Sequence, residues 1–219
     1  MKGILTEEQR TRVDEGVEEI ERRTGAQIVV AVVERSDSYA ELPWKAFAFG
    51  ASITCLVILA LGFLAPYQAS LATGLVAMAG MLAFGGLCAL LTVPMPGFAR
   101  LFLSRYRSEA EVRQYAESLF LKHEVFATAE RTGLLLFVSL FEGQAVLLPD
   151  RGLADTLTGD AIGSIVGPMV ASLSCGRTGE ALERGLGGLL GVLAGARSTR
   201  SGGPAENELS NEVIEEKGS

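Results

Sequence analysis

The chain has 219 residues, of which 48% are hydrophobic, and its formal net charge is -7. Nucleic acid is a poor match as a partner, because phosphate neutralisation by Lys and Arg dominates that binding and no basic stripe interleaved with aromatic residues is present. The three cysteines and the single histidine form no C-x-x-C or Cys/His grouping, which argues against a disulfide scaffold and a structural zinc site.

The first predicted elements are a helix and a strand. Residues 6–9, Thr-Glu-Glu-Gln, have the spacing of a capping box, and apolar residues recur at helical intervals over 13–20 until Gly25 supplies a stop. Residues 27–33 are continuously apolar after Gln27 and mostly β-branched. That pattern predicts a strand buried on both faces of a sheet.

A long apolar run follows. Between Lys45 and Arg100 no Asp, Glu, Lys, Arg or His occurs. A bilayer core is roughly 30 Å thick and is crossed by about 20 apolar residues, so the run is long enough for two crossings. Residues 66–68, Pro-Tyr-Gln, break it into spans over 46–65 and 71–93. The sequence therefore predicts a transmembrane helical hairpin and an integral membrane protein.

The basic residues near the span ends predict the orientation of this hairpin. Arg35 and Lys45 precede the first span, and Arg100, Arg105 and Arg107 follow the second. Lys and Arg are retained on the cytoplasmic side of a membrane. We therefore expect both termini and the soluble domain to be cytoplasmic. The first residues are charged and lack the apolar core of a signal peptide, so the hairpin is expected to direct insertion.

A helix and a strand pair are predicted after the hairpin. Residues 108–111 repeat the spacing of a capping box, which predicts a helix from there to Lys122. Strands are predicted over 133–140 and 145–149, joined at 141–144, where a glycine can take a positive φ.

Two further helices are predicted over 160–173 and 178–194, with Pro168 interrupting or bending the first. From residue 198 the composition changes to Ser, Gly, Pro, Asn and Glu, which buries too little apolar surface to offset the entropy of ordering. We therefore expect a disordered acidic tail over 198–219.

The order of these elements predicts an α/β or α+β domain in which helices pack on a small sheet. We expect the domain to be built from two parts, 1–44 and 100–197, with the hairpin over 45–99 inserted between them.

The soluble segments resemble the TPM-domain family over 5–36 and 108–194. The resemblance is carried by Arg-Thr-Gly-Ala-Gln-Ile-Val-Val at 23–30, by Thr-Ala-Glu-Arg-Thr-Gly followed by a strand at 128–139, and by Leu-Leu-Pro-Asp-Arg-Gly at 147–152. It implies a mixed four-stranded sheet flanked by helices. It also implies accessory functions such as photosystem assembly or receptor modulation, and in some members acid phosphatase activity or divalent-cation binding. This chain departs from many relatives because its hairpin lies inside the domain.

Four carboxylates are candidate metal ligands. Asp150, Asp155 and Asp160 follow the end of a strand at five-residue spacing, and Glu142 lies in the turn before it. Oxygen ligands on loops suit Ca²⁺ or Mg²⁺, and a bound cation could activate water for phosphate ester hydrolysis. The alternative is that these residues are solvated loop acids and helix caps. Asp150 matches the aspartate that follows this strand in the family.

Three further residues have both a functional and a structural interpretation. His123 could act as an acid or base near neutral pH, but a cation after a helix is an ordinary structural placement, which we favour. Arg131 with Thr128 could bind phosphate or carboxylate, and a fixed turn before the strand explains both residues equally well.

The expected function is that of a membrane-anchored, non-catalytic factor for the assembly or modulation of a membrane-protein complex. Its expected partner is another membrane protein or a second copy of the chain. The alternative is a divalent-metal-dependent acid phosphatase that uses Asp150.

Overall fold

The computed structural model describes residues 4–64, 70–197, 209 and 213–218. The chain divides into two compact units. Unit 1 comprises Met1–Asp37 and Ser108–Ser219, and unit 2 comprises Ser38–Arg107. The mixed α/β fold with a four-stranded sheet is confirmed.

Unit 1 begins with helix α1, Glu7–Thr24, and strand β1, Gln27–Arg35. The predicted capping box is present, because the Thr6 side chain accepts from the Gln9 amide and the Gln9 side chain accepts from the Thr6 amide. Gly25 ends the helix in the left-handed conformation at φ 69°. The next residues turn directly into β1, whose first seven residues are buried.

The sheet has the strand order β3-β2-β1-β4. Strands β2, Gly133–Ser139, and β4, Ile214–Gly218, both pair in parallel with β1. Strand β3, Gln144–Pro149, pairs antiparallel with β2 through a turn in which Gly143 has φ +63°. The hairpin of strands predicted from the sequence is therefore confirmed.

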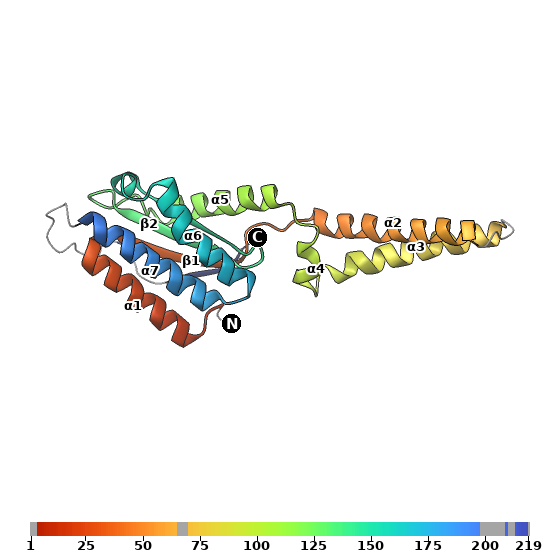
Figure 1. The fold of residues 1–219 in the computed structure, drawn as a ribbon, viewed down its shortest axis with the longest axis horizontal. Helices are drawn as coiled ribbons and strands as arrows, with labels where there is room; N and C mark the ends of the chain where they lie inside the picture. Colours follow the sequence, from red (N-terminus) through yellow and green to blue (C-terminus); the bar gives the residue numbers. More distant parts are fainter. Residues whose placement is uncertain (1–3, 65–69, 198–208, 210–212, 219) are drawn as a thin grey trace. The chain divides into compact units, whose positions relative to one another are not determined.

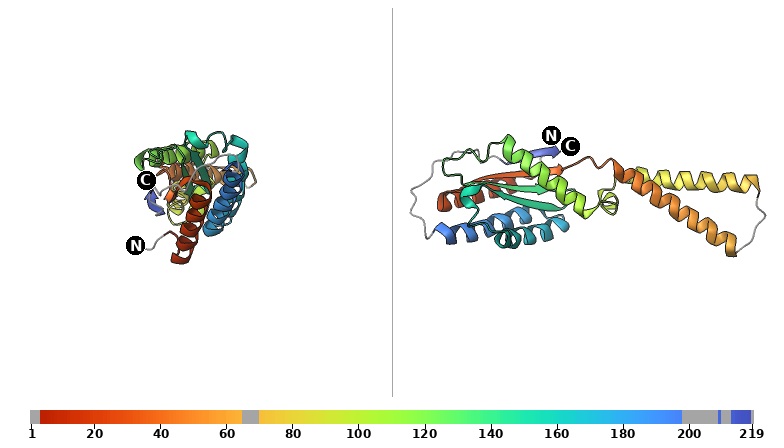
Figure 2. Two further views of the ribbon diagram at one scale, coloured as in Figure 1. Left: turned by 90° about the vertical axis from the view of Figure 1, so that its left-hand side faces the viewer. Right: turned by 90° about the horizontal axis from the view of Figure 1, so that it is seen from above.

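Helices cover both faces of the sheet (Figures 1 and 2). Helices α1, α6 (Gly159–Ser174) and α7 (Thr178–Arg197) pack on one face with the side chains of alternate strand residues such as Ile28 and Val30. Helix α5, Arg105–Lys122, packs on the other face. Two buried apolar layers therefore enclose the sheet, and α6 continues through Pro168.

Unit 2 contains the two long apolar helices α2, Glu41–Leu64, and α3, Leu71–Leu91, followed by the short helix α4, Pro96–Arg100. Helices α2 and α3 are long and apolar enough to cross a membrane, with mean hydropathies of 2.4 and 2.1. Only 6% and 11% of their most apolar windows are buried within the structure, unlike core helices of a soluble protein. The predicted break at 66–68 lies outside the described residues.

Glycine permits close contact between α2 and α3. A Cβ atom on Gly50 would lie 2.8 Å from the Sγ of Cys88 and 3.1 Å from the Cα of Gly85. Small residues at such a crossing let the two backbones approach, as is common between helices in membranes. The contact explains why Cys88 is buried although most large side chains of these helices are exposed.

Two expectations for unit 1 need correction. Ser108 does not cap a helix, because α5 begins three residues earlier and the buried Ser108 hydroxyl accepts from Gln144 Nε2 at 2.8 Å. The tail is not disordered over Ile214–Gly218, which form β4. Residues 198–208 and 210–212 lie outside the described part of the chain.

Carboxylates attach β4 to helices on both sides of the sheet. Glu215 accepts from the Ile4 amide at 2.7 Å and from Arg10 at 2.6 Å. Glu216 accepts from the Tyr115 hydroxyl at 2.8 Å and from Lys122 at 2.7 Å on the opposite face. These contacts order an acidic strand because each carboxylate meets a donor when the strand pairs with β1.

The same contacts shift two pKa values. The hydrogen bond from Lys122, followed by that from Tyr115, lowers the pKa of Glu216. Burial, together with the hydrogen bond to Glu216, raises the pKa of Tyr115 to about 12. The ionised carboxylate and the neutral phenol are thus the forms that the fold favours.

We predict that Glu216→Gln lowers the free energy of unfolding at pH 7 by about 1 kcal/mol, because the half-exposed pair with Lys122 and the bond from Tyr115 are weakened. The folded state lowers the pKa of Glu216, so its stabilisation is present above the unfolded pKa of about 4.3 and is lost as pH falls through the folded pKa. The two chains should therefore converge in acid. Urea unfolding in detergent, followed by circular dichroism, measures this.

The exposed neighbour Lys217 provides the control, because Lys217→Gln also removes one charge from β4. It should change the free energy of unfolding by less than about 0.5 kcal/mol. Equal effects of the two substitutions at pH 7 would contradict the role given to Glu216.

Candidate functional site

The two segments of strongest family resemblance meet in unit 1 at an ion pair between Arg131 and Asp150. Arg131 precedes β2 and Asp150 follows β3, whose antiparallel pairing places these two ends together. Arg131 Nε lies 2.8 Å from Asp150 Oδ2, and Arg131 Nη2 donates to Oδ1 at 3.2 Å. Oδ1 also accepts from the amide of Arg151 at 2.8 Å, at the start of the 3-10 turn Arg151–Leu153.

Burial differs sharply between the two partners. The side chain of Asp150 is 6% exposed, whereas that of Arg131 is 48% exposed and lies 5.7 Å from the centroid of the Phe126 ring. Water is thus nearly excluded from the carboxylate, which depends on Arg131 and on the Arg151 amide for compensation.

The loop before β2 is held in a tight conformation. Arg131 has φ 57°, and the Thr128 hydroxyl accepts from the Thr132 amide at 3.0 Å. A Cβ atom on Gly152 would lie 2.6 Å from the carbonyl oxygens of both Glu130 and Arg131, so only glycine fits this approach. The Gly152 amide donates to the Arg131 carbonyl at 2.8 Å. Thr128 and Arg131 thus form a turn, and their anion-binding role stays a prediction.

The structure does not bring the four candidate metal ligands together. Glu142 lies at the opposite end of β3 from Asp150, where it accepts from the Ser36 amide at 3.0 Å and from the Ser139 hydroxyl. Asp155 and Asp160 are exposed, and Asp160 lies in the first turn of α6. Within the described ranges no group of three or more His, Cys, Asp or Glu residues is placed to hold a metal ion.

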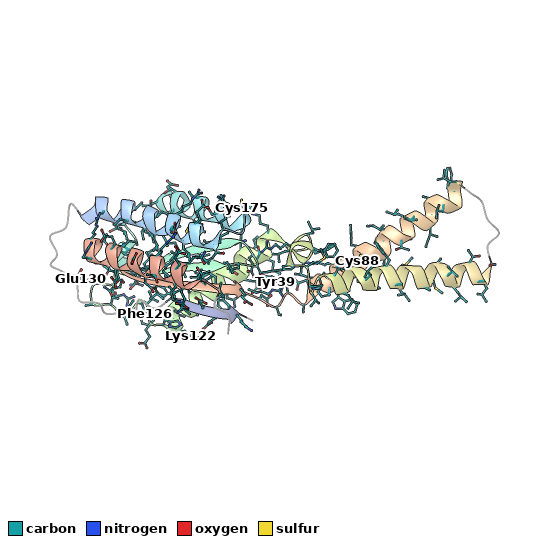
Figure 3. The ribbon with its side chains drawn as sticks, turned by 90° about the horizontal axis from the view of Figure 1, so that it is seen from below. Tyr39, Cys88, Lys122, Phe126, Glu130 and Cys175 are labelled. Carbon is teal, nitrogen blue, oxygen red and sulfur yellow. The ribbon has the colours of Figure 1, made fainter. Side chains whose placement is uncertain are left out.

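The contacts around Asp150 favour a structural role, in which Asp150 links two loops, over metal binding. A divalent cation that used Asp150 would displace the Arg131 guanidinium from a carboxylate it contacts through two nitrogens. Among the described residues, no other carboxylates join Asp150 in a group of three or more that could hold the cation. The arrangement therefore ties the loop before β2 to the loop after β3. Figure 3 shows Phe126 and Glu130 on this side of unit 1, with Cys175 toward its other end.

His123 lies just after α5 and lines a cavity of about 460 Å³. The other lining residues come from α1, β1, β4 and positions shortly before β4: Arg10, Val29, Leu209, Val213, Ile214 and Glu215. The structural interpretation of His123 stays a prediction. The positive electrostatic influence of His123 also contributes to the lowered pKa of Glu216.

No sequence pattern predicts the polar residues that hold β4: Arg10, Tyr115, Lys122, Glu215 and Glu216. Their roles depend on contacts between segments more than 90 positions apart. The available signal was the presence of the large apolar residues Leu209, Val213 and Ile214 within a mostly polar tail.

Comparison with known proteins supports the fold. No protein-family model and no curated protein matches the chain. Among solved structures, the chain is similar to the NMR structure of the BA42 protein from the psychrophilic bacterium Bizionia argentinensis, with a TM-score of 0.57 and 12% sequence identity. The similarity covers 99% of this chain and 98% of that one. At this identity the likeness extends to the fold alone.

We predict that Arg131→Ala destabilises unit 1 more than Asp150→Asn does. Removal of Arg131 leaves a buried carboxylate and should cost about 2 to 3 kcal/mol, whereas Asp150→Asn leaves a half-exposed guanidinium that water can solvate and should cost about 1 kcal/mol. The double variant should resemble Asp150→Asn alone. Urea unfolding of the full chain in detergent checks the order.

The control is Arg151→Ala, at an exposed neighbouring position. If this substitution destabilised unit 1 as much as Arg131→Ala does, the stabilising role given to the Arg131–Asp150 pair would be refuted.

Proposed function

We propose that the chain is a membrane-anchored TPM-like accessory domain that acts on a membrane-protein complex from the cytoplasmic side and does not catalyse a reaction. The observation that carries this proposal is that unit 1 is formed by two segments that are separated in the sequence. Strand β2 pairs along its whole length with the first seven residues of β1, although unit 2 with its two apolar helices lies between them in the sequence.

Pairing of β1 with β2 has a consequence for topology. Both flanks of unit 2 belong to one folded unit, so the two apolar helices must leave and return to the same side of a bilayer. The Ile4 amide and Glu215 are also hydrogen bonded, which brings residues near both chain ends together. The basic residues Arg100, Arg105 and Arg107 favour the cytoplasm as that side.

The charge distribution supports an interaction role. Unit 1 carries 25 acidic and 15 basic side chains, and the buried Asp150 is committed to Arg131. Acidic surface of this kind suits a partner with complementary charge at the membrane surface. The alternative, a metal-dependent phosphatase, would require Asp150 to exchange Arg131 for a cation, and the contacts around Asp150 favour the accessory role.

Cys175 offers a built-in test of the topology. It is exposed in the turn between α6 and α7, whereas Cys55 and Cys88 lie in the apolar helices. We predict that a membrane-impermeant maleimide labels the chain only after cells are permeabilised, because Cys175 faces the cytoplasm. The variant Cys175→Ser should not be labelled in either condition. Labelling of Cys175 in intact cells would reverse the proposed orientation.

A photocrosslinking experiment tests the accessory role. Leu121 on α5 is 64% exposed and is the one large, strongly exposed apolar side chain in the described part of unit 1. A photoreactive residue at position 121 should give an adduct with a specific membrane protein, suppressed by excess untagged chain. The same residue at Glu18, exposed on α1, serves as the comparison position. The absence of a competed adduct at every exposed position sampled on unit 1 would count against this function, as would metal-dependent phosphatase turnover abolished by Asp150→Asn.

A further inference from the structure

Unit 2 has a charge opposite to that of the rest of the chain. Its basic side chains are Lys45, Arg100, Arg105 and Arg107, and its acidic side chain is Glu41. Glu41 and Lys45 lie at the start of α2, before its uncharged part, and the three arginines follow α3. A net positive charge is thus concentrated where the apolar segments end, in a chain whose total charge is -7.

Aromatic packing holds the segment after α3 against the beginning of α2. The ring of Phe102 lies with its centroid 5.5 Å from that of Phe49 in α2 and 5.3 Å from that of Phe98 in α4. The Lys45 ammonium donates to the Phe102 carbonyl at 3.3 Å. The basic residues on both sides of the hairpin therefore belong to one structure.

Glu41 does not cancel the positive charge of this region. Arg107 Nη1 lies 2.9 Å from Glu41 Oε1, and Lys45 Nζ lies 3.8 Å from the same oxygen. A single carboxylate shared between two cations leaves the set of five charged side chains with a net positive charge. We call Lys45, Arg100, Arg105 and Arg107 the basic collar.

Two exposed aromatic side chains adjoin the collar in sequence. Trp44 precedes Lys45 and is 73% exposed, and Tyr106 lies between Arg105 and Arg107 and is 84% exposed. Trp and Tyr are enriched at the level of lipid headgroups, where their amphipathic rings meet both acyl chains and water. Long Lys and Arg side chains place their stems along apolar surface and their charges among the headgroups.

We propose that the basic collar binds the headgroups of anionic phospholipids and so selects the lipids around the hairpin. The inference rests on the proposed insertion of α2 and α3 into a membrane. Clustered Lys and Arg next to a membrane span attract anionic headgroups, while zwitterionic headgroups offer no net charge to attract. The strongly acidic unit 1 is repelled by the same lipids, so the collar is the part of the chain with the complementary charge.

Trp44 makes the proposal measurable, because it is the only tryptophan in the chain. The full chain is reconstituted in vesicles of phosphatidylcholine with phosphatidylglycerol as the minor component, and one lipid at a time carries brominated acyl chains that quench Trp fluorescence. We expect brominated phosphatidylglycerol to quench Trp44 about threefold more than its mole fraction predicts. The excess should fall in high salt, because screening shortens the range of the attraction.

Charge-removal variants give the matched control. The triple variant Lys45→Gln, Arg100→Gln and Arg105→Gln should lower quenching by phosphatidylglycerol to the level of its mole fraction while quenching by brominated phosphatidylcholine persists. The control Arg12→Gln, Arg22→Gln and Arg23→Gln removes the same charge from exposed positions of α1 and should retain the excess.

The outcomes separate this inference from the function on which it rests. Quenching in proportion to mole fraction for both lipids, or an equal effect of the two triple variants, would overturn lipid selection and leave membrane insertion intact. Absence of quenching by either brominated lipid would overturn the insertion itself.

Discussion

The pairing of β1 with β2 is the constraint on which the rest of the structure depends. Residues Gln27 to Val33 pair in register with Gly133 to Ser139, and both strands are buried by helices on the two faces of the sheet. The apolar hairpin lies between these strands in the sequence. Burial of apolar surface drives this pairing, and for a hairpin inserted in a membrane it requires both connections to emerge on the same side. The pairing that forms unit 1 therefore also restricts the membrane topology that the chain can adopt.

Four carboxylates hold edges and loops of unit 1 in place. Glu215 and Glu216 attach β4 to α1 and α5, and Asp150 with Arg131 joins two loops at one end of the strand pair. At the other end, Glu142 joins the carboxyl end of β1 to the turn after β2. A carboxylate that accepts from fixed donors in this way stabilises a loop or edge because its removal leaves those donors unpaired. The charged residues of unit 2 have a different setting, because its basic residues adjoin exposed aromatic residues in the sequence.

Much of the fold could be predicted because it depends on neighbouring residues. The capping box at Thr6, the buried strand after Gln27 and the turn at Gly143 are local patterns, and each is present. The same reasoning was wrong at Ser108, where the spacing of a capping box occurs inside α5 and the hydroxyl bonds to Gln144 instead. For the candidate site, Asp150 and Arg131 were recognised, but the contact between them was not predicted. Asp150, Asp155 and Asp160, which share a sequence spacing, form no metal-binding group with Glu142 among the described residues.

The sequence by itself determined the local elements and the two spans of apolar residues, because helix caps, strand periodicity and the absence of charge act over a few neighbouring positions. Only the tertiary structure decided that an acidic terminal segment becomes β4 and that Asp150 is held by Arg131. The composition of such a segment predicts disorder, because it contains little apolar surface to offset the entropy lost on ordering. The donors that compensate, Arg10, Tyr115 and Lys122, are distant in the chain and cannot be inferred from the segment itself. The fold likewise decides whether a carboxylate binds a metal ion or links two segments of the chain, because it determines which partner lies beside the carboxylate.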